Sequence, residues 1–401
     1  MQLKDILSNI QESLPLFFPE IGLVAGIVLL LLLDLFLSEQ KRGVFKYFTS
    51  GVLVAVYGFS VSQYCPLVFG STLFEGKLLL GKESVILKLL FELTGLGVVL
   101  FAIFDKNKFK KYEGRVEYYV LILAVVLGAH LMVMAENLLV VFISIELVSL
   151  SSYVLTAIDK DKKKGFEGSI KYLVFGVVAS AFMLYGMSWV YGLSGSLDFK
   201  AFQYLITPQQ NWFVSLILLF VLLGFLFKIA AVPMHSWVPD VYQSAPNSIV
   251  ALFSIIPKLA GLMVLYHFVS ALGINITLNK VIIVISIVSI CIGNLGAFWQ
   301  KDIKRMLAYS SIAHAGFLLI GLFAASDYAL KAILFYGFML MIANLGAFFL
   351  IRVLWKYTNS TQLETFSGLG RRLPLLGIAA TIVMACLTGC LLYTSPSPRD
   401  A

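Results

Sequence analysis

The chain has 401 residues, of which 60% are hydrophobic and only 13% are charged, and its formal net charge is +8. This composition excludes an ordinary soluble domain, in which about 45–50% of residues are apolar. The positive charge does not indicate nucleic-acid binding, because cytoplasmic loops of membrane proteins collect Lys and Arg. The sequence predicts an all-α polytopic membrane protein that contacts the lipid bilayer and binds no nucleic acid.

Apolar runs recur along the chain, and each is long enough to cross a hydrocarbon core of about 30 Å as a helix. The first run is too long for a cleaved signal peptide, and Asp34 interrupts its end, so we expect a retained span. A twelfth run begins near Pro374. The eleven predicted spans are residues 15–37, 47–66, 85–104, 117–135, 138–157, 172–193, 212–232, 247–270, 279–299, 306–325 and 328–355.

Basic clusters occupy every second connection between these spans, and the intervening connections hold only isolated lysines such as Lys77 and Lys280. The connection around His235 and Asp240 is the one exception. By the positive-inside rule, the N-terminus lies on the non-cytoplasmic side. The clusters are Lys41, Arg42 and Lys46; Lys106 to Arg115; Lys160 to Lys164; Lys301, Lys304 and Arg305; and Arg352, Lys356, Arg371 and Arg372.

Residues 390–401, CLLYTSPSPRDA, differ abruptly from the apolar run before them. Two Ser-Pro pairs would end a span part-way across the membrane, where lipid cannot satisfy the backbone. The segment is typical of translated adapter sequence joined to a shortened reading frame; a short native tail is the alternative.

Glu146, Lys228 and Lys258 are the main candidates among the ionisable residues within predicted spans, where a charge costs several kcal/mol and is by default a functional hypothesis. Glu146 is in the middle of the fifth span and is followed closely by hydroxyl residues. Lys228 lies near the end of the seventh span, where snorkelling to the interface is the alternative. Lys258 lies about half-way along the eighth span. Glu146 and Lys228 are expected to pair and to exchange protons when either environment changes.

Prolines follow Lys228 and precede Lys258. Pro233 and Pro239 should break the helix just after Lys228, because proline removes a backbone donor and clashes with the preceding turn. Pro257 should bend the next helix. Broken helices beside buried charges are typical of membrane proteins that move ions at mid-depth.

The remaining titratable residues are open to two interpretations. His235 and His314 are candidate proton relays near neutral pH, with packing as an equal alternative. The others are interpreted as follows: His130 and His267 as packing residues, Asp34, Lys304 and Arg305 as interfacial anchors, Glu92 as undecided, and Cys65, Cys291 and Cys386 as small core residues without metal-ligand spacing.

No phosphate-binding loop, paired-cysteine cluster spacing or dinucleotide fingerprint is present in the sequence. The chain therefore shows no cofactor-binding or metal site of its own. Its energy source is expected to be an ion gradient or a partner protein.

The sequence resembles the antiporter-like, proton-translocating membrane subunits of NADH–quinone oxidoreductase (respiratory complex I), and within them subunit N. The resemblance runs from about Pro19 to Gly389. It is carried by FPEIGL, ENLLVVFISIELVSLSSYVL, SIKYLVFGVVASAFMLYG, FKIAAVPMHSWVPDVYQSAP, KDIKRMLAYSSIAHAGF and ANLGAFF.

The resemblance implies a fold of fourteen helices with two inverted five-helix repeats and a proton route along the membrane midplane. It divides the chain into N-terminal helices (1–116), a first repeat (117–270) and an incomplete second repeat (271–389). Glu146, Lys228 and Lys258 match the family's proton-carrying residues; a further family lysine on the twelfth helix is not reached. NADH, FMN, iron–sulfur clusters and quinone would be bound by partner subunits in a bacterial inner membrane.

Three other functions stay open. The chain could be a subunit of an independent cation/proton antiporter, or of an energy-converting membrane hydrogenase, which differ from complex I in their partners. It could also be a passive spacer with a silent row of lysines, against which the broken helix argues.

Overall fold

The structure is a computed structural model that describes residues 3–37, 42–64, 68–104, 113–159, 163–204, 212–273, 276–323 and 327–387. Two sequence predictions lie outside the described residues: the packing role of Cys65 and the foreign origin of residues 390–401. Everything below concerns the described part of the chain.

Long apolar helices dominate the fold, and in the described residues eleven of them are long and apolar enough to cross a membrane. Each matches a predicted span, so the all-α polytopic prediction is confirmed. They are α2 (Phe18–Phe36), α3 (Val44–Ser62), α4 (Lys82–Phe104), α5 (Val116–Met134), α6 (Leu138–Thr156), α7 (Lys163–Ser194), α8 (Trp212–Ile229), α10 (Asn247–Leu272), α11 (Ile276–Phe298), α12 (Ile303–Phe323) and α13 (Asp327–Thr358).

Shorter elements connect or flank the spans. The run that begins at Pro374 forms a helix of 14 residues, α15 (Pro374–Leu387). The elements that the sequence did not predict are α1 (Leu3–Ser13), the antiparallel strands β1 (Ser71–Leu73) and β2 (Leu78–Leu80), α9 (Val238–Ser244), α14 (Leu369–Arg372) and the 3-10 turns at Pro15–Phe17, Phe199–Tyr204 and Leu363–Phe366.

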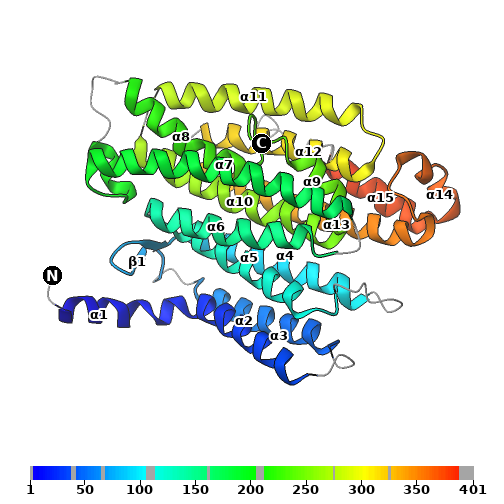
Figure 1. The fold of residues 1–401 in the computed structure, drawn as a ribbon, viewed down its shortest axis with the longest axis horizontal. Coiled ribbons are helices and arrows are strands. Elements are labelled where there is room, and N and C mark those ends of the chain that lie inside the picture. The colour runs from blue at the N-terminus through cyan, green and yellow to red at the C-terminus, as the bar shows by residue number, and fades with distance from the viewer. Residues whose placement is uncertain are drawn as a thin grey trace, which may run out of the picture.

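The spans lie roughly side by side in a layered bundle, with α2 and α3 on one side and α11 on the other (Figure 1). Helix α10 occupies the centre, where it contacts α4, α5, α8 and α13. In the most apolar stretch of 18 residues in α10, every residue is buried. In the corresponding stretches of α2, α7 and α11, only about a third of the residues are buried. The core of the protein is therefore built around α10.

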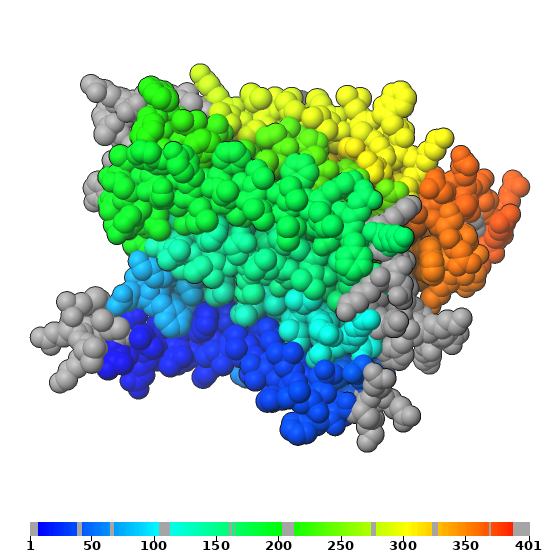
Figure 2. Space-filling view, in the orientation of Figure 1, coloured from blue at the N-terminus to red at the C-terminus, as the bar shows by residue number. Residues whose placement is uncertain are grey.

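The outer surface is strongly apolar. Along α7, which forms much of the green surface in Figure 2, large side chains such as Ile170, Val174 and Tyr185 are more than half exposed. A soluble monomer rarely exposes an apolar surface of this extent. This surface therefore suits contact with lipid tails or with apolar partner helices.

The seventh span is broken, as the sequence predicted. Helix α8 ends at Ile229, one residue after Lys228, and the short helix α9 begins at Val238. Between them Ala230 has a φ of 65°, a left-handed conformation that residues with a side chain rarely adopt. In contrast, α10 is continuous through Pro257, and the bend expected there stays a prediction.

Candidate functional site

Glu146 lies on α6 near the middle of its span and is half-buried. Its Oε1 accepts a hydrogen bond from the Ser180 hydroxyl on α7. The two helices pack against each other. The carboxyl group of Glu146 thus has a hydroxyl partner within the span.

Lys228 lies on α8 and is more deeply buried than Glu146, with an exposed fraction of only 2%. Its Nζ donates to Ser149 Oγ at 2.9 Å and approaches the Ile145 carbonyl oxygen at 3.4 Å, so both contacts reach α6. The ammonium is therefore held inside the protein. The alternative in which Lys228 snorkels to the interface does not fit this geometry.

The close packing of α8 on α10 positions Lys228. A Cβ added at Gly261 of α10 would lie 3.2 Å from Lys228 Cβ and 3.4 Å from its Cγ. Glycine is the residue that allows this approach of the two helices. The lysine stem is thus fixed by α10, while its ammonium reaches towards α6.

The expected contact between Glu146 and Lys228 is indirect in this structure. The two groups interact electrostatically. Among the ion pairs of the described residues, however, none joins them within 4.0 Å, and the ammonium is bonded to Ser149 instead. Ser149 lies three residues after Glu146, on the same helix. Because residues three apart share one face of a helix, Ser149 and Glu146 are neighbouring partners for Lys228 on α6.

Lys258 forms a second station on α10 and is 3% exposed. Its Nζ donates to both the carbonyl and the hydroxyl oxygen of Ser311 on α12. The Ser311 hydroxyl lies 3.2 Å from the Tyr242 hydroxyl on α9. A buried lysine is therefore bonded to a hydroxyl group that can both donate and accept a hydrogen bond, and that hydroxyl contacts a second one.

His314 extends this group of polar residues towards the end of the described chain. Its Nδ1 lies 2.5 Å from the Tyr336 hydroxyl on α13, and its ring interacts electrostatically with Lys258. His314 also lines a cavity of about 570 Å³ between α11, α12 and α15, with Asn294, Ser310 and Met384 among its other walls. The relay interpretation of His314 gains a geometric basis here.

His235 does not join these groups. It lies in the connection between α8 and α9, half-buried, and its Nδ1 has no hydrogen-bond partner among the described residues. Burial lowers the pKa of its imidazole, so the neutral form is favoured. The relay role proposed for His235 from the sequence stays a prediction.

Helix α9 is fastened by charged side chains from two neighbouring helices. Asp240 accepts from Lys171 of α7 at 2.9 Å and from Arg305 of α12 at 2.7 Å. Burial raises the pKa of Asp240, but the hydrogen bonds from Lys171 and Arg305 outweigh it, and the net pKa is lowered. Lys304 was expected, with Arg305, to be an interfacial anchor. Instead it is buried and donates to the carbonyl oxygens of Gln243 and Ala245.

Sequence reasoning missed the hydroxyl partners Ser180, Ser311, Tyr242 and Tyr336. Only Ser149 lay in the hydroxyl group noted after Glu146. The missed residues come from four other helices, and no spacing in the sequence connects them to the lysines. The only signal in the sequence for such a partner is a serine within a span. Serines that only pack between helices look the same in the sequence.

The chain matches a family model described as "NADH:quinone oxidoreductase/Mrp antiporter, TM" over residues 135–393. Among curated proteins, it is 32% identical to NADH-quinone oxidoreductase subunit N of Chlorobium chlorochromatii, over 97% of this chain and 78% of the relative. It is 35% identical to NADH-quinone oxidoreductase subunit N 2 of Sorangium cellulosum, over 94% of this chain and 78% of that relative.

Chains in two solved structures are also similar to this chain. A chain of respiratory complex I from Thermus thermophilus aligns with a TM-score of 0.76 and 30% identity, over 92% of this chain and 78% of that one. A chain of the Mrp complex from Dietzia sp. aligns with a TM-score of 0.80 over 94% and 71%, at 22% identity, which shows a common fold alone.

Proposed function

This chain belongs to the NADH:quinone oxidoreductase/Mrp antiporter transmembrane family, and on that premise we propose that it is a proton-translocating membrane subunit of an NADH–quinone oxidoreductase, equivalent to subunit N. It is thus a subunit of an enzyme complex. The oxidoreductase chemistry occurs elsewhere in the assembly, and this chain couples it to proton movement.

One observation carries the proposal: one half-buried acidic group and three buried basic groups follow one another on α6, α8, α10 and α12, each bonded to a hydroxyl group. Glu146 is bonded to Ser180, Lys228 to Ser149, Lys258 to Ser311 and His314 to Tyr336. A structural ion pair would not require a succession of such groups on four helices. Groups that each hold or release one proton, spaced by hydroxyls, suit proton transfer.

The mechanism follows from the two alternative partners of Lys228. When Lys228 lies against Ser149, its positive charge is shared between a hydroxyl and a carbonyl oxygen. Movement towards Glu146 would favour the ammonium, and movement away would favour release of a proton from Nζ. The released proton would pass towards Lys258, whose Nζ is bonded to Ser311.

The broken span supplies the movable element. The break after Ile229 frees the end of α8 from the helical ladder, and α9 is held separately by Asp240. A displacement at one end of the protein can therefore change the Lys228 contacts without unfolding α8. Helices α5 to α10 would form the first repeat, residues 117–270, and residues 271–389 part of the second.

The remaining parts of the proposal concern the assembly. NADH, FMN, iron–sulfur clusters and quinone would be bound by partner subunits, and this chain would contact other membrane subunits through its apolar faces. The alternation of basic loops supports a bacterial inner membrane topology with the N-terminus on the non-cytoplasmic side.

The test is proton pumping by the assembled complex in sealed vesicles that carry a Lys258→Met or Glu146→Gln variant. We expect proton uptake per NADH oxidised to fall several-fold, because each substitution removes a proton-carrying group while the redox centres stay intact. NADH oxidation and proton uptake are recorded in the same sample.

Lys280→Met is the matched control, since Lys280 is an exposed lysine on the outer helix α11. It should leave the ratio unchanged. Full pumping by assembled complexes with Lys258→Met and Glu146→Gln would refute the proposed role. Sodium-driven transport in vesicles without any NADH oxidation would favour an independent antiporter.

A further inference from the structure

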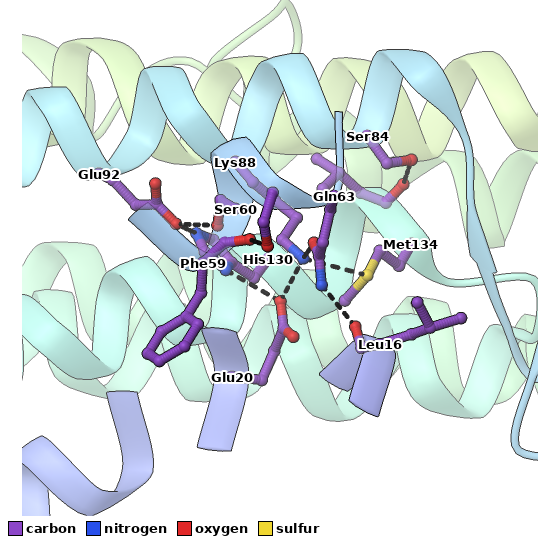
Figure 3. A network of polar contacts seen from close by, with 12 residues as sticks. Leu16, Glu20, Phe59, Ser60, Gln63, Ser84, Lys88, Glu92, His130 and Met134 are labelled. Atoms are coloured by element: carbon purple, nitrogen blue, oxygen red, sulfur yellow. Dashed lines mark hydrogen bonds and ion pairs between the residues drawn. The ribbon is translucent and has the colours of Figure 1, made fainter. Parts of the chain in front are cut away.

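A second group of buried ionisable residues lies in the N-terminal helices, away from the residues used above. It consists of Glu20 on α2, Lys88 and Glu92 on α4, and His130 on α5 (Figure 3). The side chains of Glu20, Lys88 and His130 are fully buried, and Glu92 is 1% exposed. We call these four residues the N-terminal cluster. Four buried ionisable groups in one place are costly unless they are paired or functional.

Lys88 and Glu20 form the fixed half of the cluster. Lys88 Nζ lies 2.8 Å from Glu20 Oε1, 2.8 Å from Gln63 Oε1 and 3.9 Å from Met134 Sδ. An ammonium has three hydrogens, and each has an acceptor here. Lys88 is therefore held as a cation, Glu20 as its anionic partner, and their charges cancel.

His130 and Glu92 form the variable half. His130 Nδ1 lies 3.0 Å from Glu20 Oε1, which already accepts from Lys88, so Nδ1 carries the hydrogen. His130 Nε2 then faces Glu92 Oε1 at 3.5 Å, a distance longer than a normal hydrogen bond. Ser60 also donates to Glu92 Oε1, at 2.6 Å. In the described structure, His130 Nε2 and Glu92 Oε2 have no hydrogen-bond partner.

Charge accounting assigns one proton to this pair. With both His130 Nε2 and Glu92 unprotonated, the cluster would carry a buried net charge of −1; with both protonated, it would carry +1. A single shared proton makes it neutral, and that proton can reside on Glu92 or on His130. Two interacting groups that share one proton titrate as a unit.

We propose that the N-terminal cluster is a second proton-binding site, in which one exchangeable proton moves between Glu92 and His130. In this transfer the proton leaves a Glu92 carboxyl oxygen and binds His130 Nε2, giving a carboxylate beside an imidazolium, and no other bond changes. Glu20 stabilises the imidazolium through Nδ1, and Ser60 stabilises the carboxylate.

The surroundings favour a proton over a metal ion as the occupant. Lys88 lies in the cluster and repels a cation, and the described residues contain no set of His, Cys, Asp and Glu ligands arranged for a metal. The charged groups that act on His130 come from α2 and α4, namely Glu20 and Lys88. Those that act on Glu92 are the same two residues. Helix α3 contributes the neutral Ser60, and the neutral Gln63 follows directly after this helix.

The test is infrared difference spectroscopy of the full chain in liposomes, recorded between two pH values in H2O and D2O. We use a Glu146→Gln background, so that this carboxyl group outside the cluster does not contribute. A protonated carboxylic acid band that responds to pH should be present and should be lost in Glu92→Gln. In His130→Gln the band should persist without an imidazole signal. Circular dichroism shows whether each variant is folded.

Ser60→Ala is the variant that keeps every ionisable group and removes one hydrogen bond to Glu92. It should shift the carboxylic acid band without abolishing it, which identifies the band even if Glu92→Gln does not fold. A spectrum that is the same in Ser60→Ala, Glu92→Gln and the parent would overturn the proposal and leave a static ion-pair network. The experiment needs no partner subunit and no NADH, so its outcome is independent of the pumping assignment.

Discussion

Buried serine hydroxyls are the direct partners of both central lysines. Ser149 accepts from Lys228 and itself donates to the Ile145 carbonyl oxygen at 2.7 Å. Ser311 accepts from Lys258 in the same way. A hydroxyl oxygen can accept a hydrogen bond from an ammonium group. The same hydroxyl can donate its hydrogen to a neutral amine, because a hydroxyl is both a donor and an acceptor. These serines therefore suit a lysine that changes its protonation state, which a fixed carboxylate would oppose.

Replacing Ser149 by Ala tests this role at the level of one residue. The buried ammonium of Lys228 would keep only the 3.4 Å contact with Ile145, and an unsatisfied buried donor costs about 1–3 kcal/mol. We expect a lower midpoint of thermal unfolding and slower proton uptake by the assembled complex.

Ser152→Ala is the matched control for this substitution. Ser152 is equally buried on the same helix, but its hydroxyl bonds the Val148 carbonyl oxygen of that helix. If Ser152→Ala impaired uptake as much as Ser149→Ala, the effect would reflect helix packing and not the lysine contact.

At the scale of one element, α9 is too short to be stable alone. It has seven residues, and isolated helices below about 12–15 residues are marginal in water. Tertiary contacts hold it in place. The Trp237 ring, just before α9, stacks on Tyr172 with centroids 4.0 Å apart, and Lys304 donates to carbonyl oxygens at its C-terminal end. Cations stabilise that end of a helix.

The Asp240 contacts predict a pH dependence of stability. The folded-state pKa of Asp240 is lowered, so its contribution is fully present above the unfolded pKa of about 3.9 and is lost as the pH falls through the folded value. Asp240→Asn should lower stability at neutral pH by roughly 1 kcal/mol, the upper range for a partly exposed ion pair.

Thermal unfolding of both proteins across the acidic range measures this difference. It should be constant above about pH 5 and shrink below pH 4. A difference that persisted unchanged in acid would mean that the Asp240 carboxylate does not hold α9 through its charge.

At the scale of the whole molecule, an ion pair joins α13 to a connection far away in the sequence. Arg352 of α13 donates to Glu113, which precedes α5, at 2.7 Å, and the two side chains are 6% and 0% exposed. Helix α13 also packs on α10 and α4. The N-terminal helices and the late spans are therefore connected directly, as well as through the central α10.

Breaking this pair should be strongly destabilising. Glu113→Gln removes the carboxylate that accepts from the buried Arg352, and breaking a buried ion pair by removing one side costs about 3–5 kcal/mol. The double variant Glu113→Gln with Arg352→Met should be more stable than Glu113→Gln alone. Unfolding of the single and double variants in the same detergent measures the coupling, and additive effects would show that the pair contributes nothing as a pair.

The sequence by itself determined the spans and the strongest site candidates. Lipid permits only long apolar helices with satisfied backbones, so span positions could be predicted within a few residues, except that α7 begins at Lys163 and not near residue 172. For the same reason Glu146, Lys228 and Lys258 were conspicuous as charges within such helices. The break after Lys228 was predictable because proline disrupts a helix locally.

Only the tertiary structure decided the partners of those residues. The bonding of Lys228 to Ser149 instead of Glu146, and of Lys258 to Ser311, depends on how α8 and α10 pack on α6 and α12. The N-terminal cluster was missed for the same reason. Glu20 and Lys88 lie near the ends of their spans, where a charge is ordinary in the sequence. Their burial arises only when α2, α4 and α5 pack together, because packing removes water from a group that a lone helix would leave at the interface.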